Sequence, residues 1–247
     1  MSALEEALEE VNVDRVLEIL ESNPGLSQDE LDNTLFEAVS SEGLEAAITP
    51  SLIHGAKITQ RTFLGATRRQ DVVAFQAFLD HGWDINSVEF DQPALRLVTR
   101  TETVLKWFLD HGADPNLRDK IDCSPLATAA LKPPTVAIRA FEILIDHGAE
   151  VDSRALFYSM DPRGKGGIPV MKYLIARGVD VNAIGSMVGS REGTPLHYAV
   201  ALKSEEKINL LLDAGADKTI KTSYGMTPAD VAKSRGYMEI FEFLSRG

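Results

Sequence analysis

Five histidines and one cysteine are among the side chains of this chain that could bind a metal ion or act as nucleophiles. The spacings that bring such groups together, such as His-Glu-x-x-His, Cys-x-x-Cys and Gly-x-Ser-x-Gly, do not occur. Cys123 has no activating base near it in the sequence, so an inert thiol is expected. We therefore predict no catalytic residue, no metal site and no cofactor.

Four of the histidines, His54, His81, His111 and His147, stand directly before a glycine. The glycines follow segments such as TVLKWFLD and AIRAFEILID, in which apolar residues are spaced three and four apart as in a helix with one buried face. Glycine can end such a helix in the left-handed conformation, and a histidine beside it can bond the last carbonyls. Structural roles are therefore expected for these four histidines.

The elements that carry these residues recur along the chain. The phrases FLDHGWDIN, FLDHGADPN and LIDHGAEVD begin at residues 78, 108 and 144, and equivalent glycines follow one another at intervals of 27 to 37 residues. After most of these glycines comes a turn, and then a second helix that opens with Ser-Pro or Thr-Pro, as in SPLATAA and TPADVA. The sequence predicts a repeated unit of a turn, a short helix and a longer helix.

At TPLHYAVA (194–201) and LLDAGAD (211–217) the sequence resembles the ankyrin repeat family. The resemblance implies an all-α ankyrin repeat solenoid of about eight helix-turn-helix units, with short β-hairpin-like fingers joining one unit to the next. It also implies a hydrogen-bonded scaffold role for His197. HEAT-like helical repeats are the alternative, although their units are longer and lack the Gly-Ala-Asp turn.

We expect the array to be a single ankyrin repeat domain over residues 1–247. Residues 1–56 would form acidic, divergent N-terminal capping units, 57–226 the central repeats and 227–247 the C-terminal capping unit, because a terminal unit needs a polar outer face.

Three stretches exceed the length of the repeat. Residues 131–137 and 160–169 lengthen the turn between the two helices of a pair, and 183–193 lengthens the finger between two units. Long loops in a compact array are often functional. Asn182 lies in a stretch that is similar to the sites that asparagine hydroxylases modify in ankyrin proteins, but stabilisation of its turn is the preferred interpretation.

The net charge of −12 comes from one end of the chain. Residues 1–56 hold thirteen acids and one base, while the remainder is balanced. A protein that binds by neutralising phosphates needs a basic face, so nucleic acid is a poor candidate partner. No stretch predicts a secretory signal or a membrane span, and one cysteine fits a reducing compartment. These features predict a cytoplasmic or nuclear protein without membrane contact.

The predicted function is non-catalytic binding of a protein partner. Aligning the first helices of the units leaves one column that need not pack, and in ankyrin proteins this column lines the concave face beside the fingers. Aromatic side chains there would supply large contact areas. The predicted contact residues, from this column and the fingers, are Phe90, Arg96, Ile121, Thr128, Tyr158, Met187, Arg191, Tyr198, Tyr224 and Met226.

Two alternatives stay open at this point. The first is a small-molecule binding protein or enzyme, in which loops 160–169 and 183–193 form a pocket and Tyr158, Asp161, Arg163 and Tyr198 act as binding or acid/base groups. The second is a homo-oligomer joined through apolar finger residues. A monomer is the preferred state.

Overall fold

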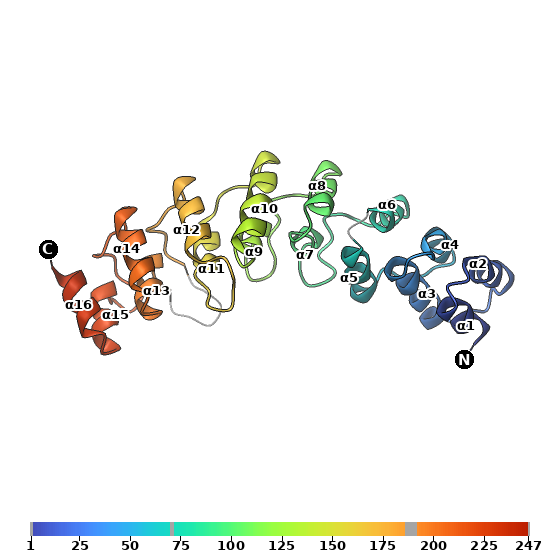
Figure 1. Cartoon of the computed structure of the whole chain (residues 1–247), viewed down its shortest axis with the longest axis horizontal. Coiled ribbons are helices and arrows are strands. Elements are labelled where there is room, and N and C mark those ends of the chain that lie inside the picture. Colours follow the sequence, from blue (N-terminus) through green and yellow to red (C-terminus); the bar gives the residue numbers. More distant parts are fainter. Residues whose placement is uncertain (1, 70–71, 186–191, 247) are drawn as a thin grey trace. The chain divides into compact units, whose positions relative to one another are not determined.

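The computed structural model describes residues 2–69, 72–185 and 192–246. Within these residues the chain forms helices α1 to α16 and a short 3₁₀ helix η1 (Figure 1). None of the described residues belongs to a β-strand. The helices follow one another in eight pairs, which confirms the predicted helical array. They group into two compact units, the N-terminal unit (1–114) and the C-terminal unit (115–247).

The N-terminal unit consists of four helix pairs. Helix α3 packs against α1 and α5, and α4 packs against α2 and α6. Two of its first helices are longer than the second helices that follow them, unlike the predicted order of a short helix and a longer one. The elements are α1 (Ala3–Glu9), α2 (Val13–Ser22), α3 (Gln28–Ser40), η1 (Glu45–Ala47), α4 (Ile48–Ile53), α5 (Gln60–Arg68), α6 (Val73–Asp80), α7 (Ala94–Leu97) and α8 (Glu102–Asp110).

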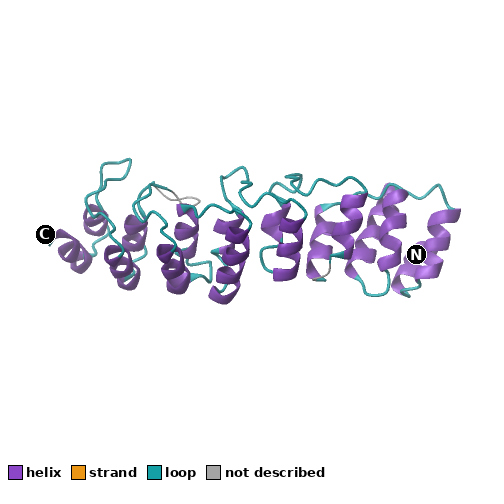
Figure 2. Cartoon of the chain, turned by 90° about the horizontal axis from the view of Figure 1, so that it is seen from above, coloured by secondary structure: helices purple, strands orange, loops and turns teal. Residues whose placement is uncertain are grey.

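The C-terminal unit keeps the predicted order of a shorter and a longer helix in every pair. Its first helices pack in a row, and its second helices α10, α12 and α14 form another row (Figure 1). The finger loops lie along one edge of these helices (Figure 2). The elements are α9 (Pro125–Ala129), α10 (Pro134–Asp146), α11 (Ser153–Ser159), α12 (Gly167–Ala176), α13 (Pro195–Ala201), α14 (Glu205–Asp213), α15 (Pro228–Ser234) and α16 (Met238–Ser245).

Helix ends follow the predicted caps. The hydroxyl oxygen of Ser124 accepts the backbone N–H of Ala127 at 3.0 Å, and Thr227 and Asp230 cap α15 reciprocally. The repeated glycines have positive φ values, such as +90° at Gly112, as an ending of this kind requires. Where they occur, the hydroxyl caps mark the start of a helix and the glycines mark its end.

The predicted role of the histidines before these glycines is confirmed for three of them. In His81, His111 and His147, Nδ1 bonds the carbonyl oxygen four residues earlier, at 2.7 to 2.8 Å. The ring therefore satisfies a carbonyl in the last turn of its helix.

Three asparagines each join one turn to the turn of the following repeat. Asn116 Nδ2 donates to the carbonyl oxygen of Gly148 at 2.9 Å, and Asn116 Oδ1 accepts the backbone N–H of Glu150 at 2.8 Å. Asn182 makes the same pair of bonds to Gly215 and Asp217, and Asn86 makes it to Gly112 and Asp114. The turn-stabilising role predicted for Asn182 is confirmed, and the turn it supports includes that of the next repeat.

The core of each unit is made of large apolar side chains from both rows of helices. In the N-terminal unit, Phe63, Phe75 and Phe108 are fully buried, with Phe75 and Phe108 centroids 4.9 Å apart. In the C-terminal unit, Phe141 and Phe157 are buried in the same way. Because these rings contact neighbouring repeats as well as their own, no single repeat could bury its apolar face alone.

Candidate protein-binding surface

Helices α13 and α15 stand side by side in the C-terminal unit, and a histidine ties the finger before α15 to α13. His197 Nδ1 accepts the backbone N–H of Thr194 at 3.1 Å and lies 2.8 Å from the Thr194 hydroxyl. Its Nε2 lies 2.9 Å from the carbonyl oxygen of Met226. With Nδ1 as acceptor, the hydrogen is on Nε2, which donates to Met226. The scaffold role implied for His197 is thus confirmed.

Burial lowers the pKa of His197, and the bond to Met226 offsets only part of that effect. The imidazole is 5% exposed, so a proton on Nδ1 would be costly and would break the hydrogen bond from the Thr194 N–H. The ring is therefore neutral near pH 7 and holds the finger at a fixed position relative to α13.

An open hollow of about 420 Å³ lies on this pair of helices, and we call it the tyrosine hollow. Helices α13 and α15 contribute part of the lining, and the fingers before each helix contribute more. Its lining residues are Glu192, Gly193, His197, Tyr198, Ala201, Thr222, Tyr224, Met226, Val231, Ser234 and Arg235.

The chemistry of the tyrosine hollow changes along its length. Glu192 lies at the finger end, three residues before the start of α13, and Arg235 lies just after the opposite end of α15. Apolar groups of Tyr198, Met226 and Val231 are part of the lining between these ends. A surface of this kind can bury an apolar side chain and pair charged groups beside it, which is how protein interfaces are built.

Three of the predicted contact residues meet at this hollow. Tyr198 comes from α13, and Tyr224 and Met226 come from the finger before α15. Tyr224 is 69% exposed, while Tyr198 and Met226 are half-buried. Met187 and Arg191 lie outside the residues that the structure describes.

Three other predicted contact residues are buried, which contradicts the surface positions predicted for them. Phe90 is buried against the ring of Phe63, at 5.1 Å between centroids, because its finger folds back over the core. Tyr158 is 8% exposed, since both Phe157 and Tyr158 in the degenerate stretch RALFYSM pack inward. Thr128 is buried as well, and its hydroxyl bonds the Ser124 carbonyl oxygen at 3.1 Å.

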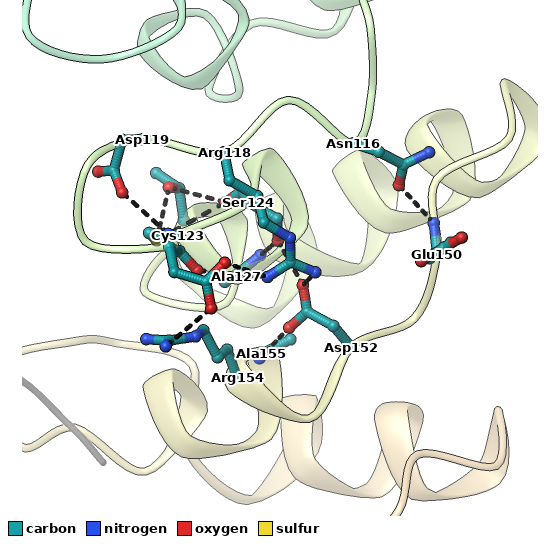
Figure 3. A network of polar contacts seen from close by, with 12 residues as sticks. Asn116, Arg118, Asp119, Cys123, Ser124, Ala127, Glu150, Asp152, Arg154 and Ala155 are labelled. Atoms are coloured by element: carbon teal, nitrogen blue, oxygen red, sulfur yellow. Dashed lines mark hydrogen bonds and ion pairs between the residues drawn. The ribbon is translucent and has the colours of Figure 1, made fainter. Parts of the chain in front are cut away.

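Ile121 projects from a different finger of the C-terminal unit. It is 54% exposed, and the finger that carries it is held by ion pairs to the next repeat. Figure 3 shows Arg118, Asp152 and Arg154 of this network. Arg118 pairs with Asp152 at 3.1 Å, and Arg154 pairs with Asp122 at 2.8 Å. Arg96, on α7 of the N-terminal unit, is half-buried. Neither Ile121 nor Arg96 lines the tyrosine hollow.

Only some of the residues that were predicted to form a small-molecule pocket lie close together in the structure. Asp161 is buried and receives bonds from Arg163, including Nη2 to Oδ2 at 2.6 Å, and this guanidinium lowers the pKa of the Asp161 carboxyl. Lys207 donates to the carbonyl oxygen of Met160 at 3.1 Å and so holds the start of the same loop. Loop 160–169 contributes no lining residue to the tyrosine hollow, whereas Glu192 and Gly193 of the second loop do. The ion pair between Asp161 and Arg163 therefore stabilises the turn at the start of loop 160–169.

Arg235 was missed by reasoning from the sequence. Its Nη1 donates to the carbonyl oxygen of Ala201 at 3.2 Å, which holds the guanidinium at the edge of the hollow. The alignment of helix positions considered only residues within the first helices, and Arg235 follows the last residue of α15. Arg235 stands directly before Gly236, a helix-ending glycine, and this position in the sequence could have indicated that it lies at the end of α15.

Among the residues described, no cluster of three histidine, cysteine or acidic side chains is arranged as a metal site. The described helices include none that is both long enough and apolar enough to span a membrane.

The fold and the hollow together define an α-helical repeat protein with an open, partly aromatic surface. The family model of ankyrin repeats (three copies) matches residues 135–222 and 156–247. A crystal structure of an ankyrin repeat domain from Acinetobacter baumannii resembles 75% of this chain and 97% of its own, with a TM-score of 0.55 and 25% identity. The two matched ranges together cover residues 135–247, and this part of the chain consists of ankyrin repeats.

Two curated relatives show the range of similar proteins. A putative ankyrin repeat protein of Escherichia coli is 27% identical over 74% of this chain and 93% of its own length. The ankyrin repeat and SOCS box protein 11 of Danio rerio is 29% identical over 49% of this chain. The match spans only 39% of that longer relative. Ankyrin repeats are generally protein-interaction modules and generally non-enzymatic.

Proposed function

We propose that this chain is a non-catalytic module that binds a protein partner, and that the tyrosine hollow is the centre of its contact surface. The observation that carries the proposal is the convergence of Tyr198, Tyr224 and Met226 on one open hollow of about 420 Å³. Tyrosine presents a large, rigid contact area with a polar tip and loses little entropy on binding. The general role of ankyrin repeats supports the same conclusion.

The rigidity of the surface also supports this function. His197 fixes the finger that carries Tyr224 and Met226 to the helix that carries Tyr198. Ordering a mobile surface on binding costs free energy, so a surface that is already held in place binds more tightly.

We propose in addition that the module acts in the cytoplasm or nucleus, and that it is a monomer with a single array of repeats.

The proposal is tested by affinity capture from lysate of the native cells, with the wild-type chain and a Tyr198→Ala/Tyr224→Ala variant as baits. A protein retained by the wild type and lost by the variant is expected. Phe243→Ala is the matched control, because Phe243 is an exposed aromatic residue on α16 that does not line the hollow.

Circular dichroism melts establish that all three baits are folded. Equal retention of the same proteins by the wild type and the double variant would exclude the hollow as the contact surface. Light scattering on the purified chain tests the monomer, and a mass of two or more chains would contradict it.

A further inference from the structure

We infer that the tyrosine hollow binds an extended peptide segment in which an aspartate or glutamate side chain lies close to a large apolar side chain. The carboxylate would pair with Arg235, and the apolar side chain would contact Tyr198, Met226 and Val231. This inference rests on the proposed function and names the chemistry of the partner.

The length of the hollow suits a short extended segment. Lining residues extend from Gly193, before α13, to Ala201 at its end. Seven helical residues rise about 10 Å, and an extended peptide advances about 3.3 Å per residue. Three or four peptide residues would therefore span roughly the length of α13. A peptide that spans this length would therefore carry the carboxylate and the apolar side chain within about three or four residues.

Arg235 is held in a position that leaves most of its donors for a ligand. A guanidinium carries five N–H groups in a planar fork, and the bond from Nη1 to Ala201 uses one of them. A fixed, planar guanidinium can bind a carboxylate through two parallel bonds, and its preorganisation reduces the entropy lost. Arg235 is exposed, so a ligand carboxylate can reach it.

The segments that form the hollow carry more bases than acids, although the whole chain is acidic. The first-helix and finger segments 192–204 and 219–236 carry four bases and two acids. One of these acids, Asp230, accepts hydrogen bonds from the backbone and hydroxyl of Thr227. The four bases are Lys203, Lys221, Lys233 and Arg235. Of these bases only Arg235 lines the hollow, and the ammonium groups of Lys203 and Lys233 lie over the rings of Tyr237 and Phe241. Arg235 is therefore the base that can attract a carboxylate into the hollow.

Glu192 sets the orientation that the segment can take. It is the other acid of these segments and lies at the finger end of the hollow, away from Arg235 along α13. A carboxylate placed at the finger end would face a like charge, whereas one placed at Arg235 would face an opposite charge. The acidic side chain of the ligand is therefore assigned to the Arg235 end.

The test is selection from a phage library of short random peptides, displayed so that the C-terminus of each peptide is joined to the coat protein. The immobilised full chain is the bait, and peptides that also bind the Tyr198→Ala/Tyr224→Ala variant are removed. We expect the recovered peptides to share an aspartate or glutamate within about four residues of an aromatic or large aliphatic residue.

Affinity measurements then assign the carboxylate to Arg235. One recovered peptide is synthesised with both termini blocked, together with its acid-to-amide version, and their binding is measured by fluorescence polarisation. The amide peptide should bind the wild type about tenfold more weakly. Arg235→Gln should bind both peptides equally weakly, and Arg139→Gln, an exposed arginine on α10, should behave as the wild type.

The outcomes separate the two proposals. Recovered peptides without acidic enrichment, or equal losses for the amide peptide in wild type and Arg235→Gln, would overturn the inference and leave the binding function intact. If no peptide remains after those that bind the variant are removed, the inference of a peptide ligand fails, and the affinity capture decides the binding function separately.

Discussion

At the scale of single residues, His197 contributes most to the geometry of the candidate surface. It bonds Thr194 on one side and Met226 on the other, so the finger that bears Tyr224 depends on a neutral imidazole. The finger should loosen when that ring is protonated, because an Nδ1–H group cannot accept the hydrogen bond from the Thr194 N–H. Binding at the hollow is thereby linked to the state of one buried side chain.

The first prediction is a loss of stability at acid pH. Burial lowers the pKa of folded His197 below its ordinary value of 6.5, so the unfolded chain binds a proton there more readily than the folded chain. The unfolding free energy should therefore fall as the pH decreases from 6.5 towards the folded pKa. Urea melts of the wild type and His197→Gln, taken at several pH values, measure this dependence.

The variant should be about 1 to 3 kcal/mol less stable at neutral pH and should depend less on pH. His54→Gln is the control, because His54 is an exposed histidine before a helix-ending glycine and should leave the pH dependence of the wild type unchanged. Identical pH dependence in the wild type and His197→Gln would show that His197 does not carry the effect.

The second prediction concerns Gly166, where the loop after α11 touches the preceding repeat. A Cβ at this position would overlap the carbonyl oxygen of Ala130 and lie 3.3 Å from Val170 Cγ2. Gly166→Ala should lower the unfolding free energy by about 1 to 3 kcal/mol, because backbone must move to relieve the contact. Gly25→Ala, where the nearest atom is Asn23 Oδ1 at 3.4 Å, should have a much smaller effect in the same urea melts.

At the scale of the elements, the asparagine bridges are the most regular connection between repeats. The sequence predicted turn-stabilising asparagines, but it could not show that Asn116 bonds the next turn, 32 and 34 residues away. That contact depends on how the repeats stack. The bridges hold successive fingers at a constant separation, and this separation positions the side chains of the binding surface.

The third prediction is that Asn116→Ala lowers the unfolding free energy by about 1 to 2 kcal/mol, since two hydrogen bonds of an exposed turn are lost. Asn116→Asp should also be destabilised, because it keeps an acceptor for Glu150 but directs negative charge at the Gly148 carbonyl. Asn209→Ala, an exposed asparagine on α14, is the control for thermal melts. Equal melting of all four proteins would exclude a stabilising bridge.

The helices could be predicted from the sequence because their signals are local. Ser124 and Thr227 cap helices where the Ser-Pro and Thr-Pro pairs predicted them, and the glycines end them. Exposure of single aromatic side chains could not be predicted, because it depends on the neighbouring repeat. Tyr158 and Phe90 are buried for this reason, whereas Tyr198 and Tyr224 reach the surface.

At the scale of the whole molecule, the charge is concentrated at one end. Residues 1–56 carry thirteen acids and a single base, and the acids repel one another at neutral pH. Both tryptophans, Trp83 and Trp107, lie in the same N-terminal unit, so tryptophan fluorescence reports its unfolding. The stability of this unit should therefore depend on salt.

The fourth prediction is that the fluorescence melting temperature rises by about 3 °C or more between low salt and roughly 0.5 M sodium chloride. A variant with Glu9→Gln, Glu10→Gln and Glu18→Gln, all exposed positions, should melt higher at low salt and gain less from added salt. A salt response unchanged by these substitutions would contradict a repulsive origin.

Hydrogen exchange on the complex with the captured partner tests the central claim most directly. Amide exchange would be compared between the free and bound chain, with the Tyr198→Ala/Tyr224→Ala variant as the non-binding reference. Binding at the tyrosine hollow predicts new protection in residues 193–202 and 221–235. Protection confined to the second helices α10, α12 and α14, with none in those segments, would contradict the proposed surface.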